Sequence, residues 1–395
     1  MKIGRWARLL LVAAPLLAGC GDFWQAPGGS GSGSGGCTTN CTTASSGNFY
    51  ILNAGTTPQV VGESIVSGTL TALSGSPWSV SAAPYAMAMS PNGDLLFVST
   101  TAGVYVYPIT AGKLGTAVQV STDSAALALQ VDSTGSWLIE ALEATGGVTL
   151  ASIPINPTTG AENGTEPTSA FYTVTSASVQ QNKIAISPDN KNVFVALGTG
   201  GTIVVPFTAG ATGGSSPFGA TGTDIAVVKS GGSALSVAVD PTNRLFYIGE
   251  TLANSGGTSG GLRAFTYSSL GGTLAQATGS PIASGGLAPN FILPIFSGDY
   301  VYVANGQGTS SAGNVAEFTV SGSSTYTIAA GSTSATGTQP YGLAEDSTGN
   351  FVLAISSLGS PYFNAYTFDT TTAGKLDSQI TANTGSAPIA IVATP

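Results

Sequence analysis

The sequence predicts an all-β fold, a seven-bladed β-propeller that occupies residues 47–395. Three observations carry this prediction. A turn motif recurs about every fifty residues, four short apolar strands fit between successive copies, and the C-terminal segment has the pattern of a first strand. With 42% hydrophobic residues in 395 positions, the chain has enough apolar side chains for a large core despite its 55 glycines.

The first twenty residues have the order of a secretory signal: basic residues, an apolar run over 9–17, and then Leu17-Ala18-Gly19-Cys20. The run is too short to span a bilayer. Small residues directly before a cysteine resemble the bacterial lipobox, in which the cysteine is lipidated and the chain is cut before it. We therefore expect a signal peptide over 1–19 and a lipid anchor on Cys20, the alternative being an ordinary thiol. Gly21 is not the aspartate linked to inner-membrane retention, which favours the outer membrane.

Residues 20–46 are rich in Gly, Ser and Thr and contain too few apolar side chains to fold, so they predict a flexible linker behind the lipidated cysteine. Cys37 and Cys41 lie within it. An even pair in an oxidising compartment favours a small disulfide loop. Two thiols in a chain without histidine make a poor metal site, so we expect no metal there.

The clearest repeat is a turn of the type Ser/Asp-Pro-x-Gly. Ser or Asp accepts hydrogen bonds from the turn amides, Pro presets φ at the second position, and Gly or Asn tolerates a positive φ at the fourth. The fourth residues of six copies stand at 93, 135, 190, 243, 298 and 349, so the spacing lies between 42 and 55 residues. Each interval holds four short strands with β-branched and aromatic residues, which is typical of a propeller blade.

The two ends of the chain predict how the ring closes. The segment 49–53 has the pattern of a second strand, and 388–391 has the pattern of a first strand. The last blade is therefore expected to combine one C-terminal strand with three N-terminal strands, which removes a free sheet edge.

Composition excludes several functions. The chain has no histidine, so a Ser-His-Asp triad and histidine-based metal sites are ruled out. A net charge of -9 argues against binding to nucleic acid, which needs clustered Lys and Arg. Asp-containing turns offer a single carboxylate each, whereas calcium needs several oxygen ligands. We expect no metal and no cofactor.

The pattern Pro-x-x-x-Ala-x-Ser-Pro-Asn-Gly at 84–93, followed by an apolar strand, resembles the seven-bladed lactonase-type propellers related to 6-phosphogluconolactonase and the YVTN repeat proteins. The resemblance extends over 47–395 and concerns turn and strand residues, which have no chemical role. Lactonase sites in that family draw on a histidine, arginines and a glutamate. The mature chain retains only Arg244 and Arg263 as arginines, which makes a poor phosphosugar site.

The first residues of the inner strands are expected to ring one mouth of the central channel. Tyr85, Asn182, Asn290 and Tyr341 in this ring either bind a sugar or peptide ligand or simply fill a narrow channel. Two positions further in lies an apolar set that predicts packing between blades rather than ligand binding: Met87, Leu129, Ile184, Val237, Ile292, Leu343 and Ile391. Long loops at 250–261, 305–313 and 357–363 are expected on the same face, where binding usually occurs.

Glu345 is the single carboxylate identified in a row that is otherwise apolar, since its equivalents include Met89, Ile186 and Val239. It is either a catalytic base with a raised pKa or a solvated side chain on a locally twisted strand. Glu317 and Arg263, on neighbouring third strands, are expected to form a structural pair.

These features favour a monomeric, outer-membrane-anchored binding or scaffold protein whose long-loop face takes a glycan or protein ligand. The alternative is an enzyme, a lactonase that hydrolyses a sugar lactone.

The lipobox reading predicts that Cys20→Ala abolishes acylation, because the thiol is the attachment point for the lipid. Membrane fractionation of wild type and variant measures this. Detergent-dependent behaviour that persists undiminished in the variant contradicts the lipobox interpretation.

Overall fold

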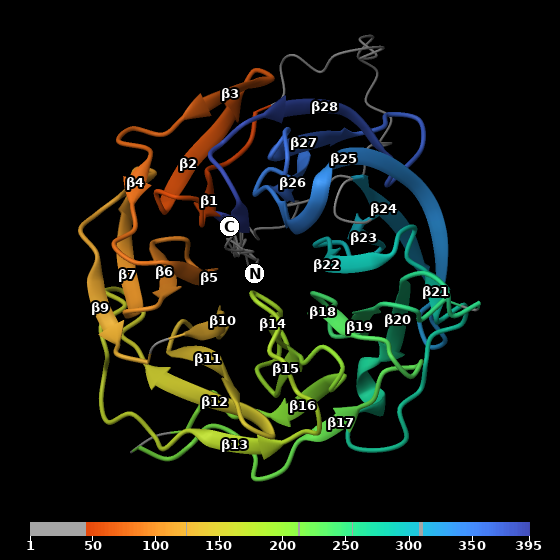
Figure 1. The fold of residues 1–395 in the computed structure, drawn as a ribbon, viewed down its shortest axis with the longest axis horizontal. Helices are drawn as coiled ribbons and strands as arrows, with labels where there is room; N and C mark the ends of the chain where they lie inside the picture. Colours follow the sequence, from red (N-terminus) through yellow and green to blue (C-terminus); the bar gives the residue numbers. More distant parts are fainter. Residues whose placement is uncertain (1–44, 124, 212–213, 255, 308–310) are drawn as a thin grey trace, which may run out of the picture.

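The computed structural model describes residues 45–123, 125–211, 214–254, 256–307 and 311–395; the expected signal peptide, Cys20, Cys37 and Cys41 lie outside these ranges. In the described residues the chain forms 29 strands and one short 3-10 helix, Tyr267–Ser269. The sheets stand around a central axis like the blades of a propeller (Figure 1). The predicted all-β propeller is confirmed.

Six sheets make up the ring in the part of the chain that the structure describes. The first contains β29 (Pro388–Ala393), β1 (Phe49–Asn53), β2 (Gln59–Val66) and β3 (Thr69–Ala72), with β4 (Trp78–Ser79) beside β2. The second contains β5 (Pro84–Met89), β6 (Leu95–Thr100), β7 (Gly103–Thr110) and β8 (Lys113–Leu114), with β9 (Val118–Ser121) beside β7. The third contains β10 (Ala126–Val131), β11 (Trp137–Ala144), β12 (Gly147–Pro154) and β13 (Ala170–Thr173).

The remaining three sheets continue in the same sense around the axis. The fourth contains β14 (Ile184–Ile186), β15 (Asn192–Ala196), β16 (Thr202–Pro206) and β17 (Thr223–Ile225). The fifth contains β18 (Ala234–Val239), β19 (Leu245–Glu250), β20 (Gly261–Thr266) and β21 (Ile282–Ala283). The sixth has seven strands: β22 (Ala288–Pro294), β23 (Tyr300–Gly306), β24 (Ala312–Ser321), β25 (Thr327–Glu345), β26 (Phe351–Leu358), β27 (Phe363–Phe368) and β28 (Leu376–Ala382).

The ring closes as the sequence predicts, because the C-terminal strand β29 pairs antiparallel with β1. Ile391 lies opposite Ile51, and β1 continues into β2 and β3. Without β29, the inner edge of β1 would expose unpaired backbone groups.

The strands nearest the axis are β5, β10, β14, β18, β22, the C-terminal part of β25, and β29; we call them the inner strands (Figure 1). Most of them end at one of the repeated turns, so the side of the molecule with these turns is here named the turn face. The side on which the inner strands begin is named the loop face. A side chain's position along an inner strand therefore gives its depth in the channel.

The turns have the predicted chemistry. In one copy, Asp132 Oδ1 accepts hydrogen bonds from the amides of Ser136 and Trp137, both at 2.8 Å. Gly93 and Asn190 occupy the fourth position of their turns with φ of 73° and 54°, the left-handed region that favours these residues.

Apolar faces of neighbouring sheets pack against one another and form most of the core. Phe246 of β19, for example, stacks on Phe265 at 5.0 Å between ring centroids and lies 5.2 Å from Phe194 of the preceding sheet. Such contacts between successive sheets recur around the ring.

The sequence singled out Glu345 as a carboxylate at an otherwise apolar position, but Glu140 occupies such a position as well. Glu140 of β11 pairs with Leu129, and the residues in the same register of other sheets are apolar, for example Val98 opposite Met87 and Ile248 opposite Val237. Glu140 is fully buried, and no hydrogen bond of normal length reaches either carboxyl oxygen from the described residues. Burial raises its pKa well above the usual range; Asp123 and Glu166 add to the rise, and the Ser121 hydroxyl opposes it.

The expected pairing of Arg263 with Glu317 is wrong. Arg263 Nη1 lies 2.5 Å from Glu250 Oε1 in a buried ion pair, and Glu317 accepts a hydrogen bond from Ser332 instead. Arg263 and Glu250 both belong to the fifth sheet, whose strands β19 and β20 pair directly, so the shorter reach within one sheet decides the partner.

We expect Glu140→Val to raise the free energy of unfolding at pH 7 by about 1–3 kcal/mol, because it removes a buried, unpartnered carboxyl group at a position that is apolar elsewhere. Chemical denaturation measures the change. Glu143→Val, at an exposed position of the same strand, is the matched control. A Glu140→Val protein less stable than wild type contradicts the prediction.

Candidate functional site

A cavity of about 480 Å³ occupies the central channel. Residues of all seven inner strands line it, and Pro188, Pro241 and Phe296 lie at its rim beside the turns. The cavity therefore lies toward the turn face. The sequence predicted ligand binding on the opposite face, among the long loops. A sequence does not show how much space remains between the inner strands.

Most of the side chains that line the cavity are apolar. Six of the seven residues expected to serve only as packing between blades line it: Met87, Ile184, Val237, Ile292, Leu343 and Ile391. They are also buried, with exposed fractions between 2% and 7%. Their burial agrees with the predicted packing between blades, and the same row also borders the cavity.

Glu345 and Gln130 are the polar side chains among the described residues that line this cavity. Glu345 ends β25, directly before the turn that begins at Asp346, which places its carboxyl group near the mouth. Its Oε2 accepts a hydrogen bond from the amide of Phe296 at 2.9 Å, while Oε1 is buried without a partner.

Burial raises the pKa of Glu345 to about 7; the bond from Phe296 opposes this and the charge of Asp346 adds to it. These features agree with the predicted alternative of a perturbed carboxyl group rather than a solvated one. Its catalytic role stays a prediction.

The four predicted binding residues lie at the loop-face end of the channel, where Asn182 and Asn290 bond to the backbone of other inner strands. Asn182 donates from Nδ2 to Ile389 O at 2.9 Å and to Tyr85 O at 3.2 Å, and its Oδ1 accepts from Met87 N at 2.9 Å. Asn290 donates to Pro340 O at 2.8 Å. Asn182 thus connects the start of the fourth sheet to the first and second sheets, whereas Asn290 and Pro340 both belong to the sixth sheet.

Lys183 was missed by the sequence reasoning. Its side chain is buried at the same end of the channel, where Nζ donates to Tyr341 O at 2.8 Å. Nζ also lies 4.3 Å from the ring centroid of Tyr341 and 4.5 Å from that of Phe291. Burial lowers its pKa to about 7. The sequence could have revealed Lys183, because several corresponding residues of other inner strands are small, for example Ala86, Ala128 and Gly342.

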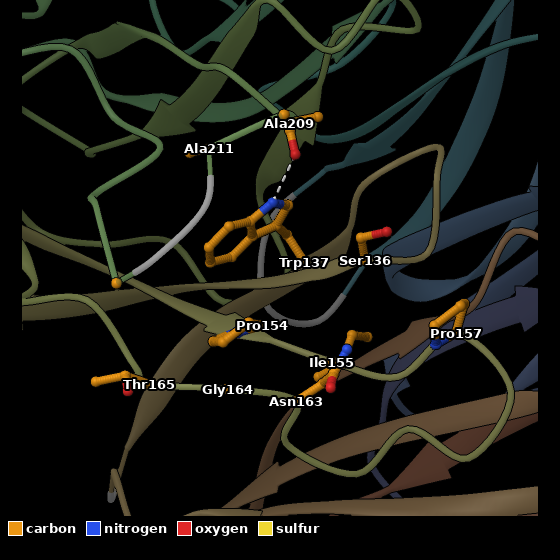
Figure 2. A pocket seen from close by; sticks show the side chains of 12 residues that line it. Ser136, Trp137, Pro154, Ile155, Pro157, Asn163, Gly164, Thr165, Ala209 and Ala211 are labelled. Atoms are coloured by element: carbon orange, nitrogen blue, oxygen red, sulfur yellow. Dashed lines mark hydrogen bonds between the residues drawn. The ribbon is translucent and has the colours of Figure 1, made fainter.

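A second cavity, of about 440 Å³, lies beside Trp137 at the outer part of the third and fourth sheets (Figure 2). The indole Nε1 of Trp137 donates to Ala209 O at 2.8 Å, so its polar atom is already engaged. No charged side chain stands among the described residues that line this cavity. It offers no group suited to acid or base chemistry.

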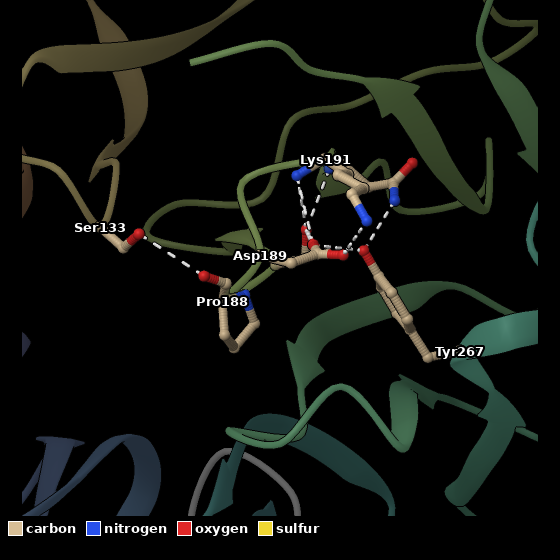
Figure 3. A network of polar contacts seen from close by, with 7 residues as sticks. Ser133, Pro188, Asp189, Lys191 and Tyr267 are labelled. Atoms are coloured by element: carbon tan, nitrogen blue, oxygen red, sulfur yellow. Dashed lines mark hydrogen bonds and ion pairs between the residues drawn. The ribbon is translucent and has the colours of Figure 1, made fainter. Parts of the chain in front are cut away.

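A polar network ties the fourth sheet to the fifth on the turn face (Figure 3). Tyr267 Oη donates to Asp189 Oδ1 at 2.7 Å and accepts from Asn192 Nδ2 at 2.8 Å. Burial opposes ionisation of Asp189, but bonds from Ser187, Tyr267 and Lys191 outweigh it and lower its pKa. All its members find partners within the protein, which is typical of a structural network.

No three acidic or cysteine side chains among the described residues are arranged to hold a metal ion. None of the helices in this part of the chain is long and apolar enough to cross a membrane.

Comparison with protein-family models finds no match, and no curated protein matches in sequence. The chain is similar in structure to a "putative 6-phosphogluconolactonase" from Bacteroides fragilis, with a TM-score of 0.67 and 15% identity over 89% of this chain and 99% of that one. It is also similar to the periplasmic gluconolactonase of Pseudomonas aeruginosa, with a TM-score of 0.65 and 16% identity over 89% and 100%.

A protein described as functionally unknown from Desulfotomaculum acetoxidans has a TM-score of 0.62 and 12% identity over 89% of this chain and 100% of that one. Identities this low establish a common fold and no more. The chain therefore has the fold of the lactonase-like β-propellers.

The raised pKa of Glu345 predicts a pH-dependent stability difference between wild type and Glu345→Gln. With a folded pKa of about 7 against the ordinary value of 4.5, protonation of Glu345 favours the folded state. This stabilisation is complete below pH 4.5 and is lost as the pH rises toward 7, by up to about 3 kcal/mol.

Denaturation of both proteins at several pH values from 4 to 8 measures the difference. The exposed Glu143→Gln is the control and should track wild type throughout. A constant difference between wild type and Glu345→Gln across this range contradicts the assigned shift.

Proposed function

We propose that the protein is a lactone hydrolase that acts in the central cavity with Glu345 as its general base. One observation carries the proposal: Glu345 is the sole carboxyl group among the described residues that line the cavity, and one of its oxygens is without a partner. A carboxyl group with a pKa of about 7 is divided between its two forms at neutral pH, which suits proton transfer. Structural likeness to proteins named as gluconolactonases supports the same reaction class.

In the proposed reaction the Glu345 carboxylate removes a proton from a water molecule as the water oxygen bonds to the lactone carbonyl carbon. The carbonyl π electrons move to oxygen and give a tetrahedral oxyanion. When this collapses, the ring C–O bond breaks, and the proton returns from Glu345 to the leaving alkoxide. The product is a hydroxy acid, which releases its own proton to solvent at neutral pH.

The substrate we propose is uncharged. No cationic side chain occurs among the described residues that line the cavity, so a phosphate group would lack a partner. Arg263 is engaged with Glu250, and Arg244 with Asp240 on the turn face. The proposed substrate is therefore not a 6-phosphogluconolactone.

Ligand binding without turnover is a second candidate, favoured by the scarcity of donors for an oxyanion. Gln130 is the other polar side chain in the described lining, whereas hydrolytic sites usually direct two or more donors at the developing charge. A binding or scaffold role on the loop face stays a prediction, as do a glycan or protein ligand and the monomeric state.

We also propose that the ring has seven blades. The N-terminal part of β25 pairs with β24 over Ser321↔Thr327 to Ala312↔Thr338, and its C-terminal part pairs with β26 up to Glu345↔Val352. The seven-stranded sheet then represents two four-stranded blades that share one continuous strand. Seven inner strands around one cavity support this count.

Attachment to the outer membrane through lipidated Cys20 is likewise proposed, on the basis of residues 1–20. The described chain begins at Ser45, whose carbonyl oxygen accepts a hydrogen bond from Thr348. A linker over 20–46 would join the anchor to the first sheet.

We expect wild-type protein to hydrolyse an uncharged δ-lactone with a rate that rises with pH around a midpoint near 7, because the base must be deprotonated. Glu345→Gln is expected to lower kcat about a hundredfold or more and to remove the pH dependence. Continuous pH-stat titration of the acid released measures both. Glu143→Gln is the control.

Three outcomes separate the candidates. Equal turnover by wild type and Glu345→Gln contradicts the role of Glu345. Saturable binding of a lactone by both proteins without hydrolysis favours the second candidate. If the protein neither binds nor hydrolyses a lactone, both candidate functions are contradicted.

A further inference from the structure

The cavity has two layers that differ in chemistry. The layer nearer the mouth contains Glu345 with Met89, Ile186 and Val239, and the deeper layer contains Met87, Val237 and Ile292 among others. The two layers are two residues apart on the inner strands, which corresponds to roughly 7 Å. A reacting carbonyl group at Glu345 thus has an apolar compartment behind it.

Sugar lactones fit this compartment poorly. Each ring hydroxyl placed in the deeper layer would lie among aliphatic and thioether side chains. Its hydrogen-bond partners there would be limited to Gln130 and the backbone groups of the inner strands. An alkyl group gains instead, because each buried methylene strengthens binding about fourfold. Met87 and Met89 add flexible, polarisable side chains that adapt to chains of different length.

The rim continues the same chemistry. Phe296, whose backbone amide holds Glu345, keeps a side chain that is 51% exposed, beside Pro188 and Pro241. An exposed aromatic ring and two prolines around the mouth attract an apolar molecule more than a polyol. The rim, the mouth layer and the deeper layer therefore all favour an apolar ligand.

We infer that the ligand of this cavity is a lactone that carries an alkyl chain, with its ring beside Glu345 and its chain directed inward between Met87, Val237 and Ile292. The inference rests on the proposed lactone hydrolysis and specifies its substrate class. It assigns Val237 and Met87 to chain-length selection and leaves proton transfer to Glu345.

The test compares δ-valerolactone, δ-octalactone, δ-decalactone and δ-dodecalactone with glucono-δ-lactone as substrates of the full-length protein. We expect kcat/KM to increase about two- to fourfold per added methylene until the deeper layer is filled, and glucono-δ-lactone to be the poorest substrate. Glucono-δ-lactone hydrolysed as fast as δ-decalactone overturns the inference and leaves the proposed hydrolysis standing.

Val237→Thr keeps the shape of the side chain and adds a hydroxyl group to the deeper layer. It is expected to reduce the advantage of δ-decalactone over δ-valerolactone about fivefold or more. Val228→Thr is the matched control, because Val228 is 47% exposed and lies outside the cavity lining. Met87→Gln provides a second variant from another inner strand, should Val237→Thr fail to fold. An unchanged chain-length preference in a folded cavity variant overturns the inference.

Calorimetric titration with δ-valerolactam and its long-chain alkyl derivatives, which are not hydrolysed under these conditions, separates the two proposals. Chain-length-dependent binding of the lactams without hydrolysis of any lactone supports the ligand class and contradicts the enzymatic function. Lactam binding that does not depend on chain length overturns the inference.

Discussion

The antiparallel pairing of β29 with β1 is the constraint on which the other features depend. A ring of sheets is complete only if its two ends meet, and here the ends lie more than three hundred residues apart in sequence. Because the ring is closed, the inner strands surround a single channel instead of opening outward. The cavity, the position of Glu345 at its mouth, and the bonds across its far end all follow from that closure.

In the closed ring, each inner strand has two structural roles. Residues such as Ile184 and Val237 pack against neighbouring sheets and also border the channel, so the wall of the cavity is made of core residues. Charged groups are placed at its two ends, with Glu345 near the turns and Lys183 near the loop face. Desolvation in this setting raises the pKa of the carboxyl group and lowers that of the amine, which brings both to about 7.

Features that repeat along the chain were predictable from the sequence, whereas the partners of individual charged side chains were not. Turn chemistry at Asp132 and Gly93 is local, and the closing strand could be recognised because it repeats the pattern of the other first strands. Glu345 stood out in the same way, as an exception in an apolar row. Lys183 and Glu140 were exceptions of the same kind and were recognisable in principle from their small or apolar equivalents. The choice of Glu250 over Glu317 as partner of Arg263, by contrast, depends on which carboxylate comes within reach once the sheets have formed.

The sequence by itself determined the all-β propeller, the chemistry of its turns and the strand that closes it, because these depend on hydrophobic periodicity and on residues within a few positions of one another. Tertiary structure alone decided that the channel is hollow toward the turn face and crossed by Asn182 and Lys183 toward the loop face. The volume left along the axis depends on how seven inner strands approach one another in three dimensions, and a linear pattern of apolar residues carries no information about that separation.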